Sequence, residues 1–360
     1  MSFNHPEIMH PLKSLIGSGT RLWLDSIDPD LVRTFADLGA TGATSNPVIV
    51  SDLISTGRFD DLLSGFAAQG LNASEIAWAL TDQLVGDAQK VFRDVFESSV
   101  GNDGYVSFEL DPLLEDETNG MSLDERVESY VELGRKWSLD QPNRMIKVPA
   151  TPAGLAALGP LTELGIPLNV TLVFSMRQYN VARDAIWNAA VRTGRQKSLK
   201  SVYSIFVSRI DVYTGKHVSS LSPAAQGQVG ILNAKQIWRA NHEFWKPLDL
   251  PLDQHIVFAS TGTKKPEDAP WKYVAAFAGS DIQTNPPETN EAIANSGVAF
   301  EAMVNRPLDQ AVTDEILGNI DFERMESVLM EEGIEKFCSP QKKLLALITN
   351  RQEQLAGSNR

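Results

Sequence analysis

Lys147 is the residue of this 360-residue chain whose setting most directly suggests covalent chemistry. It is the only charged residue in the segment 145–151, Met-Ile-Lys-Val-Pro-Ala-Thr, which has the composition of a buried strand. Burial among apolar neighbours disfavours the ammonium form, so we expect the pKa of this lysine to fall below its ordinary value of roughly 10.4. A neutral amine attacks carbonyl carbon, and the segment therefore indicates Schiff-base chemistry.

A lysine near a strand commonly lies at a sheet edge with its charge in solvent, so Lys147 alone does not establish a reactive site. Other predicted strands carry polar or aromatic residues two positions apart near their carboxyl ends. These sets are Thr44 with Asn46, Ser107 with Glu109 and Asp111, Asn169 with Thr171, and Ser204 with Phe206. Residues two apart in a strand point to the same side, so we expect one polar face near the strand ends.

Eight short segments rich in β-branched and apolar residues recur along the chain, and most are separated by spacers of helical length. They are residues 21–27, 41–47, 105–111, 145–151, 167–174, 201–208, 255–260 and 281–286. Strands that alternate with helices indicate a parallel α/β sheet, and eight of them predict a closed (β/α)8 TIM barrel. Active sites of such barrels lie at the carboxyl ends of the strands.

We expect one domain that spans residues 1–360, with additional helices in 48–104 and 305–357. Asn72 followed by Glu75 resembles a capping box and predicts a helix start. Ser339 and Pro340 are predicted to be the N-cap and first residue of a last helix. No internal repeat or long linker rich in proline and glycine divides the chain.

Composition restricts the class of protein. A hydrophobic content of 42% and a mean hydropathy of -0.16 are typical of a globular chain with a large core. The net charge of -14 opposes nonspecific binding to nucleic acid or to an anionic membrane. There is no apolar run of about 18 residues and no signal-peptide pattern, and the single Cys338 cannot form an internal disulfide, so we expect a cytoplasmic protein. The sequence does not specify an oligomeric state.

Six segments, in this order, resemble the transaldolase family of class I aldolases. They are Leu-Trp-Leu-Asp at 22–25, Thr-Gly-Ala-Thr-Ser-Asn-Pro at 41–47, Ile-Lys-Val-Pro-Ala-Thr at 146–151, Leu-Asn-Val-Thr-Leu-Val-Phe-Ser at 168–175 with Gln178 and Tyr179, Ser-Val-Tyr-Ser-Ile-Phe-Val-Ser-Arg-Ile-Asp at 201–211, and Ala-Ser-Thr-Gly-Thr-Lys at 259–264. The resemblance covers the chain from about residue 21 to at least Pro287.

The resemblance implies transfer of a three-carbon dihydroxyacetone unit between sugar phosphates, without a metal or an organic cofactor. The donor would be sedoheptulose 7-phosphate or fructose 6-phosphate, and the acceptor glyceraldehyde 3-phosphate or erythrose 4-phosphate. These are reactions of the non-oxidative pentose phosphate pathway.

The same resemblance implies roles for four catalytic residues. Lys147 would form the Schiff base, and Asp25 would be the base for the C4 hydroxyl during cleavage of the C3 to C4 bond. Glu109, with a water held by Thr171, would move protons. By residue type alone, Asp25 could equally be a helix N-cap or a turn residue. Asp111 competes with Glu109, and we interpret it as a surface or capping acid.

Substrate-binding residues are implied in the same way. Asn46, Asn169 and Ser204 would hold hydroxyls of the retained unit, since an amide both donates and accepts hydrogen bonds. Arg209 presents a planar fork for a phosphate, and Ser260 could add a hydroxyl. The full set expected to bind substrate is Thr44, Asn46, Asn169, Ser204, Phe206, Arg209, Ser260 and Lys264.

Two departures from the family pattern concern substrate range. One branch of the family carries an arginine shortly after the serine at 260, whereas this chain has Lys264, which could substitute as a point charge. Relatives often carry an arginine just after the aspartate motif, whereas this chain reads Asp-Ser-Ile-Asp-Pro-Asp at 25–30.

Three other functions compete with transfer. A fructose 6-phosphate aldolase would release free dihydroxyacetone, but that group carries glutamine in place of Glu109 and tyrosine in place of Phe206. A catalytically silent barrel would have lost the lysine and the carboxylates, which are present here. A metal-dependent aldolase would use histidine and carboxylate ligands. The five histidines form no recognisable ligand spacing: His5, His10, His217, His242 and His255.

Overall fold

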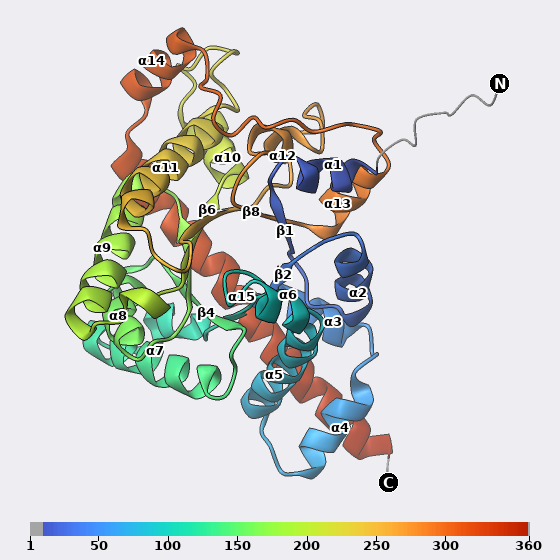
Figure 1. The fold of residues 1–360 in the computed structure, drawn as a ribbon. Coiled ribbons are helices and arrows are strands. Elements are labelled where there is room, and N and C mark those ends of the chain that lie inside the picture. The colour runs from blue at the N-terminus through green and yellow to red at the C-terminus, as the bar shows by residue number, and fades with distance from the viewer. Residues whose placement is uncertain (1–9, 359–360) are drawn as a thin grey trace, which may run out of the picture.

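The computed structural model describes residues 10–358 and contains a closed barrel of eight parallel strands in the order β1 to β8 (Figure 1). The strands are β1 Arg21–Leu24, β2 Gly42–Thr44, β3 Val106–Glu109, β4 Arg144–Pro149, β5 Leu168–Val173, β6 Ser201–Phe206, β7 His255–Ala259 and β8 Ile282–Asn285. Each strand pairs with its sequence neighbours, and β8 closes the barrel against β1. The predicted (β/α)8 TIM barrel is therefore confirmed, and every strand falls on one of the eight predicted segments.

Side chains of two kinds fill the barrel in layers. An apolar layer lies toward the amino ends of the strands and consists of Trp23, Tyr105, Met145, Val202, Val257 and Ile282. Two residues further along the strands, buried polar residues replace apolar ones, among them Ser107, Asn169 and Ser204. A structural interior is mostly filled by branched apolar side chains, so a polar layer above an apolar floor marks the functional end of the barrel.

Helices surround the barrel and join its strands. They are α1 Pro11–Gly17, α2 Pro29–Asp37, α3 Pro47–Ser55, α4 Asp60–Ala68, α5 Ala73–Val91, α6 Arg93–Ser98, α7 Leu123–Ser138, α8 Pro152–Glu163, α9 Met176–Thr193, α10 Ser208–His217, α11 Val229–Trp245, α12 Lys272–Ala276, α13 Pro287–Ala294, α14 Gln310–Asn319 and α15 Phe322–Ser358, with 3-10 turns η1 Pro112–Glu115, η2 Glu117–Asn119, η3 Gln196–Ser198 and η4 Lys246–Leu248. The predicted capping box of Asn72 and Glu75 starts α5, with both of its hydrogen bonds present.

The last helix corrects one prediction, because Ser339 and Pro340 do not begin a helix but lie inside α15. An interior proline costs roughly 3 kcal/mol in a helix because it removes a hydrogen bond and clashes with the preceding turn. Buried side chains on both sides of the proline offset that cost: Phe337, Cys338, Gln341 and Leu344. Tertiary packing thus keeps the helix continuous through Pro340.

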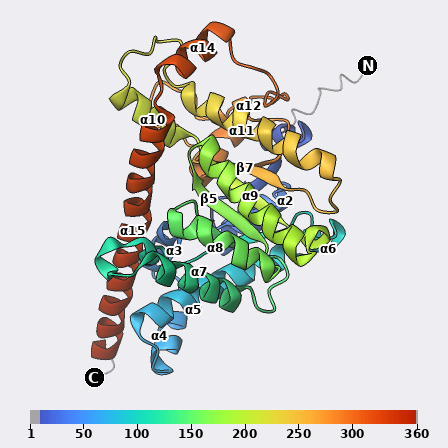
Figure 2. The same cartoon turned by 90° about the vertical axis from the view of Figure 1, so that its left-hand side faces the viewer.

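Helix α15 runs along one side of the molecule as a single long rod (Figure 2). It packs against α3, η1 and α10, which begin just after β2, β3 and β6. Since parallel strands of a barrel end on the same side, α15 lies across the loops at the carboxyl ends. It is the last helix of the described chain and follows all eight strands in sequence.

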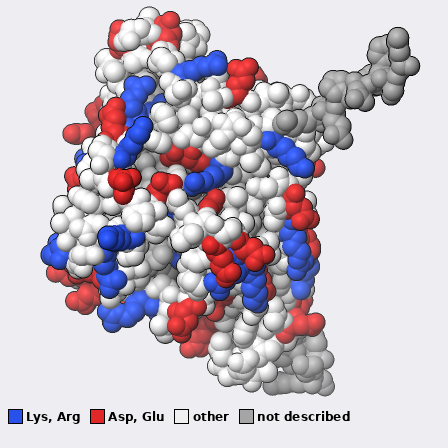
Figure 3. All heavy atoms as spheres, viewed as in Figure 1, with Lys and Arg blue, Asp and Glu red and all other residues white. Residues whose placement is uncertain are grey.

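Acidic and basic side chains are interspersed over the face shown in Figure 3, without a continuous basic stripe. Among the described residues, no helix combines the length and the apolar character that crossing a membrane requires.

Candidate active site

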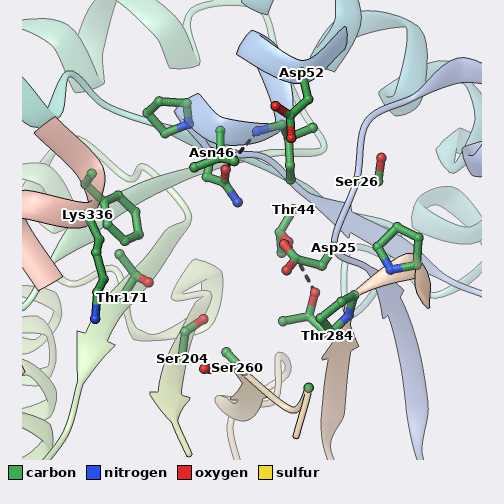
Figure 4. Close-up of a pocket in the computed structure, with 18 of the residues that line it drawn as sticks. Asp25, Ser26, Thr44, Asn46, Asp52, Thr171, Ser204, Ser260, Thr284 and Lys336 are labelled. Carbon is green, nitrogen blue, oxygen red and sulfur yellow. Dashed lines mark hydrogen bonds between the residues drawn. The ribbon is translucent and has the colours of Figure 1, made fainter. Parts of the chain in front are cut away.

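A cavity of about 590 Å³ lies at the carboxyl ends of the strands (Figure 4). Most of the side chains expected from the sequence line it: Asp25, Thr44, Asn46, Lys147, Thr171, Ser204, Phe206, Arg209, Ser260 and Lys264. The two that do not, Glu109 and Asn169, are buried beneath the cavity and hydrogen bond to residues that line it. The structure therefore brings together all the residues that were expected to be catalytic or to bind substrate.

Lys147 lies at the base of this cavity, with its side chain only 7% exposed. Its Nζ donates to Glu109 Oε2 at 3.0 Å and to the carbonyl oxygen of Ser45 at 3.2 Å. The lysine thus has a carboxylate and a carbonyl partner in addition to its apolar neighbours. The reason is the strand register, which places Lys147 on β4 directly opposite Glu109 on β3.

Glu109 is an acid whose charge the site disfavours. Burial raises the pKa of its carboxyl to about 7, with a further rise from Asp25, while the ion pair and hydrogen bond with Lys147 act in the opposite direction. A proton exchanged within this pair converts ammonium and carboxylate into neutral amine and carboxylic acid. Such an exchange yields the nucleophilic form of the lysine without moving charge into solvent.

Asp25 follows β1 and is the second acid of the cavity. Burial raises the pKa of its carboxyl, and Lys147 and the hydrogen bond from Thr44 partly oppose that rise. The Thr44 hydroxyl donates to Asp25 Oδ1 at 3.0 Å and lies 3.2 Å from the hydroxyl of Thr284 on β8. Two carboxylates in separate surroundings can take different proton-transfer roles. Asp25 is not an N-cap, since Asp28 caps α2 instead.

Thr171 occupies an irregular part of β5. The β5 to β6 register shifts between Val170 and Val173, and Leu172 has φ of +56°, in the left-handed region that β-branched and bulky residues rarely adopt. The bulge directs Leu172 into an apolar cluster with Phe206, while Thr171 faces the cavity. The Thr171 hydroxyl is buried and has no hydrogen-bond partner among residues 10–358.

The polar layer forms a chain of hydrogen bonds centred on Asn169. Its Nδ2 donates to Ser107 Oγ at 2.9 Å, and its Oδ1 accepts from Ser204 Oγ at 2.7 Å. Asn46 also has a structural task, because its Oδ1 accepts from the backbone of Ile49 at 3.0 Å and caps α3. Figure 4 shows the amide nitrogen of Asn46 turned toward the cavity, where it can donate to a ligand.

Cationic groups gather at the rim. The Arg209 guanidinium, on the first turn of α10, lies 5.0 Å from the Phe206 ring centroid, and its Nη1 is buried without a partner in the described chain. The Oγ of Ser260 lies 2.9 Å from the Oγ of Ser208, and the backbone of Ser260 has φ of +55°. Lys264, in the loop after β7, makes no hydrogen bond or ion pair with any residue that the structure describes. These groups can receive an oxyanion.

Asp111 lies outside this constellation. It caps η1 by accepting from the backbone of Leu113 at 2.9 Å, which confirms its interpretation as a capping acid.

Several side chains of the cavity were not predicted from the sequence: Ser26, Asp52, Thr284, Glu288, Lys336 and Phe337. Thr284 lies on a predicted strand, and its polarity near a strand end was an available signal. Lys336 and Phe337 belong to α15, whose sequence pattern is that of an ordinary amphipathic helix and gives no sign of a site. Within residues 10–358, no group of three or more His, Cys, Asp or Glu side chains is arranged to hold a metal ion.

Comparison with known proteins gives a consistent family. The pattern of the Transaldolase/Fructose-6-phosphate aldolase family matches residues 22–348. The protein named Transaldolase 2 from Streptomyces avermitilis is 32% identical over 96% of this chain and 98% of its own length. Those named Transaldolase from Acidothermus cellulolyticus and Thermobifida fusca are also 32% identical, over 96% and 93% of this chain and 97% and 96% of their own. The chain therefore belongs to the transaldolase/fructose-6-phosphate aldolase family of enzymes.

Proposed function

We propose that this enzyme is a transaldolase that moves a dihydroxyacetone unit between sugar phosphates through a Schiff base on Lys147. The reaction converts sedoheptulose 7-phosphate and glyceraldehyde 3-phosphate into erythrose 4-phosphate and fructose 6-phosphate. The observation that carries the proposal is the buried pair of Lys147 and Glu109, 3.0 Å apart at the base of a polar cavity. Family membership supports the substrate class.

In the first step, neutral Nζ of Lys147 attacks the ketose C2 carbonyl and gives a carbinolamine. Glu109, having taken the ammonium proton, returns it as the carbinolamine oxygen departs as water, and an iminium remains. A raised pKa suits this exchange, because the carboxyl both gains and loses a proton near neutral pH. The unpartnered hydroxyl of Thr171 can hold the water that relays the proton.

In the second step, Asp25 removes the proton of the C4 hydroxyl, and the electrons of the C3 to C4 bond flow into the iminium. The aldehyde product leaves, and an enamine stays on Lys147. Thr44 holds the Asp25 carboxylate in place, and burial makes that carboxylate a stronger base than an exposed one. The enamine then attacks the acceptor aldehyde, Asp25 returns the proton, and hydrolysis frees the new ketose.

Binding divides between the two ends of the cavity. We assign the hydroxyls of the retained unit to Asn46, Asn169 and Ser204, and the phosphate to Arg209 with Ser260 and Lys264. The cavity volume of about 590 Å³ lies within the range of roughly 300 to 1,000 Å³ typical of small-molecule sites.

Release of free dihydroxyacetone, as in a fructose 6-phosphate aldolase, is the second candidate. Two residues favour transfer over release. Glu109 is a carboxylate rather than an amide. Phe206 presents no hydroxyl to the enamine, and its ring centroid lies 5.8 Å from that of Phe174 in an edge contact. We further propose that the reaction belongs to the non-oxidative pentose phosphate pathway and needs no cofactor. We also propose that the protein acts in the cytoplasm and forms one domain spanning residues 1–360.

Borohydride reduction in the presence of fructose 6-phosphate tests the proposal. Cleavage followed by reduction of the iminium should leave one three-carbon unit on Lys147, detected by intact mass and peptide mapping. Lys147→Ala should abolish both the adduct and turnover, whereas Lys235→Ala, which removes another buried lysine that does not line the cavity, should abolish neither. An adduct on another lysine would contradict the assignment.

A further inference from the structure

One face of α15 is turned toward the barrel mouth. It carries Glu332, Gly333, Lys336 and Phe337. Glu332 and Lys336 are four residues apart, and Gly333 is three and four residues from Lys336 and Phe337, so these pairs are neighbours on the helix surface. Lys336 and Phe337 line the cavity. Gly333 faces Arg209 and Leu172, since a methyl group on this glycine would lie 3.7 Å from Arg209 Nη1. The C-terminal helix therefore forms one wall of the candidate active site.

Phe337, on this wall, lies close to both Lys147 and Arg209. Its ring centroid lies 5.9 Å from Lys147 Nζ and 6.0 Å from Arg209 Cζ. Lys336, the residue before Phe337, lines the same cavity as Arg209. Figure 4 shows the Lys336 side chain at the edge of the pocket, on the same side as Thr171.

Glu332 connects Lys336 and Arg209 electrostatically. It accepts a hydrogen bond from Lys336 Nζ at 2.9 Å, one helical turn away. That bond lowers the pKa of the Glu332 carboxyl, and Lys216 and Arg209 contribute to the same shift. Burial lowers the pKa of the Arg209 guanidinium, while the Glu332 and Glu109 carboxylates act in the opposite direction. One acid thus lies close enough to influence both cations.

We propose that Lys336 determines specificity for phosphorylated substrates: it exchanges its bond to Glu332 for one to the substrate phosphate and grips that phosphate together with Arg209. This inference rests on the proposed function. It adds to the site a residue from the C-terminal helix that neither the sequence motifs nor the barrel strands indicate.

Exposure and charge favour the exchange. The side chain of Lys336 is 52% exposed and that of Glu332 38% exposed, so their pair is a rim contact that contributes little stability on its own. A phosphate carries more charge than a carboxylate and lies beside a second cation, whose buried Nη1 has no partner in the described chain. The lysine therefore gains by leaving the carboxylate when substrate enters.

Kinetics with paired acceptors test the proposal. Lys336→Gln should lower kcat/KM about 1.5- to 5-fold for glyceraldehyde 3-phosphate, the range expected for a partly exposed charge contact, and leave it unchanged for unphosphorylated glyceraldehyde. Lys343→Gln removes the same charge from an exposed position of the same helix and should change neither value. Glu332→Gln, which frees the lysine, should raise kcat/KM for the phosphorylated acceptor only. The Lys336 effect should shrink with added salt.

The outcomes separate this inference from the proposed function. If wild-type protein forms the borohydride adduct but Lys336→Gln matches wild type with both acceptors, the inference is wrong and the transaldolase assignment stands. Equal losses with both acceptors would make Lys336 a support of α15 and would also overturn the inference. If wild-type protein forms no adduct and transfers no unit, both proposals fail together.

Discussion

Glu109 Oε2 lies 3.0 Å from Lys147 Nζ, and the two residues face each other across the neighbouring strands β3 and β4. Both side chains are almost completely buried, with 5% and 7% of their surface exposed. The position of the acid is thus fixed by backbone register and not by a mobile loop. Any proton that leaves the lysine can move to this carboxyl directly.

The first prediction concerns Glu109→Gln, which keeps the shape and burial of the side chain but cannot exchange a proton. Because general acid and base assistance typically contributes ~10² to 10⁴-fold, the transfer rate should fall by that order. Single-turnover kinetics should assign the loss to Schiff-base formation and hydrolysis. Asp111→Asn is the matched control two residues away, and it should stay close to wild type because Asp111 only caps η1. Unchanged kinetics in a folded Glu109→Gln protein would make this acid structural.

The second prediction is a pH dependence set by the same group. Because burial raises the pKa of Glu109 to about 7, its carboxyl is increasingly protonated as the pH falls through 7. A protonated Glu109 cannot accept the lysine proton, so kcat/KM should decrease on the acid side with an apparent pKa near 7. In Glu109→Gln that acid limb should disappear from the pH profile of the residual activity. A limb at the same pH in both proteins would assign it to another group.

The strand residues of the site could be predicted from sequence because strand alternation is a local property. The two-residue period of a strand turns Thr44, Asn169 and Ser204 toward the barrel interior. The register between neighbouring strands then sets their height relative to one another. Partnerships across strands are different, since no local pattern pairs Lys147 with Glu109. The hydrogen bond between Lys147 and Glu109 is therefore the part of the site that needed the structure.

Helix α15 shows the other limit of sequence reasoning. A proline after serine is a good helix start by local rules, but Pro340 lies within a helix because the flanking residues are buried against the barrel loops. The contribution of Lys336 to the cavity follows from that packing. It depends on contacts between residues more than 120 positions apart, such as Gly333 with Arg209, which no periodicity encodes.

The third prediction separates Schiff-base formation from carbon-carbon cleavage at Asp25. Asp25→Asn should still form the iminium on Lys147 but should not deprotonate the C4 hydroxyl. Borohydride reduction with fructose 6-phosphate should then leave the intact hexose phosphate on Lys147 instead of a three-carbon unit, and intact mass distinguishes the two. A three-carbon adduct formed at the wild-type rate would show that another base cleaves the bond.

The fourth prediction concerns the docking of α15 at its first turns. The buried Glu326 carboxylate accepts hydrogen bonds from Ser175, which caps α9, and from Arg177. Glu326→Ala removes these charge-assisted bonds and should lower the free energy of unfolding by about 1 to 3 kcal/mol in denaturant titrations. Glu331→Ala, at an exposed position of the same helix, should change it by no more than about 0.5 kcal/mol. Equal stabilities of the two variants would show that Glu326 does not anchor the helix.

The fifth prediction separates binding from chemistry at Arg209. A charge-assisted hydrogen bond contributes roughly 1.5 to 3 kcal/mol, so Arg209→Ala should lower kcat/KM about 10- to 150-fold with glyceraldehyde 3-phosphate. The loss should largely vanish with glyceraldehyde, which carries no phosphate for the arginine to hold. Equal losses with both acceptors would mean that Arg209, packed against Phe206 and Phe337, supports the barrel mouth instead.

Lys264→Ala, measured beside Arg209→Ala, decides whether this lysine replaces the arginine that one branch of the family carries. Its amino group has no partner among the described residues and lines the same cavity, so it is available to a phosphate without breaking another bond. As a second clamp, it should show a loss confined to the phosphorylated acceptor. The double variant Arg209→Ala with Lys264→Ala should then lose less than the product of the single losses if one phosphate binds both, because removing either cation lets the phosphate shift toward solvent. No loss in the single variant would make Lys264 a solvated loop lysine, and the phosphate would then depend on Arg209 and the wall formed by α15.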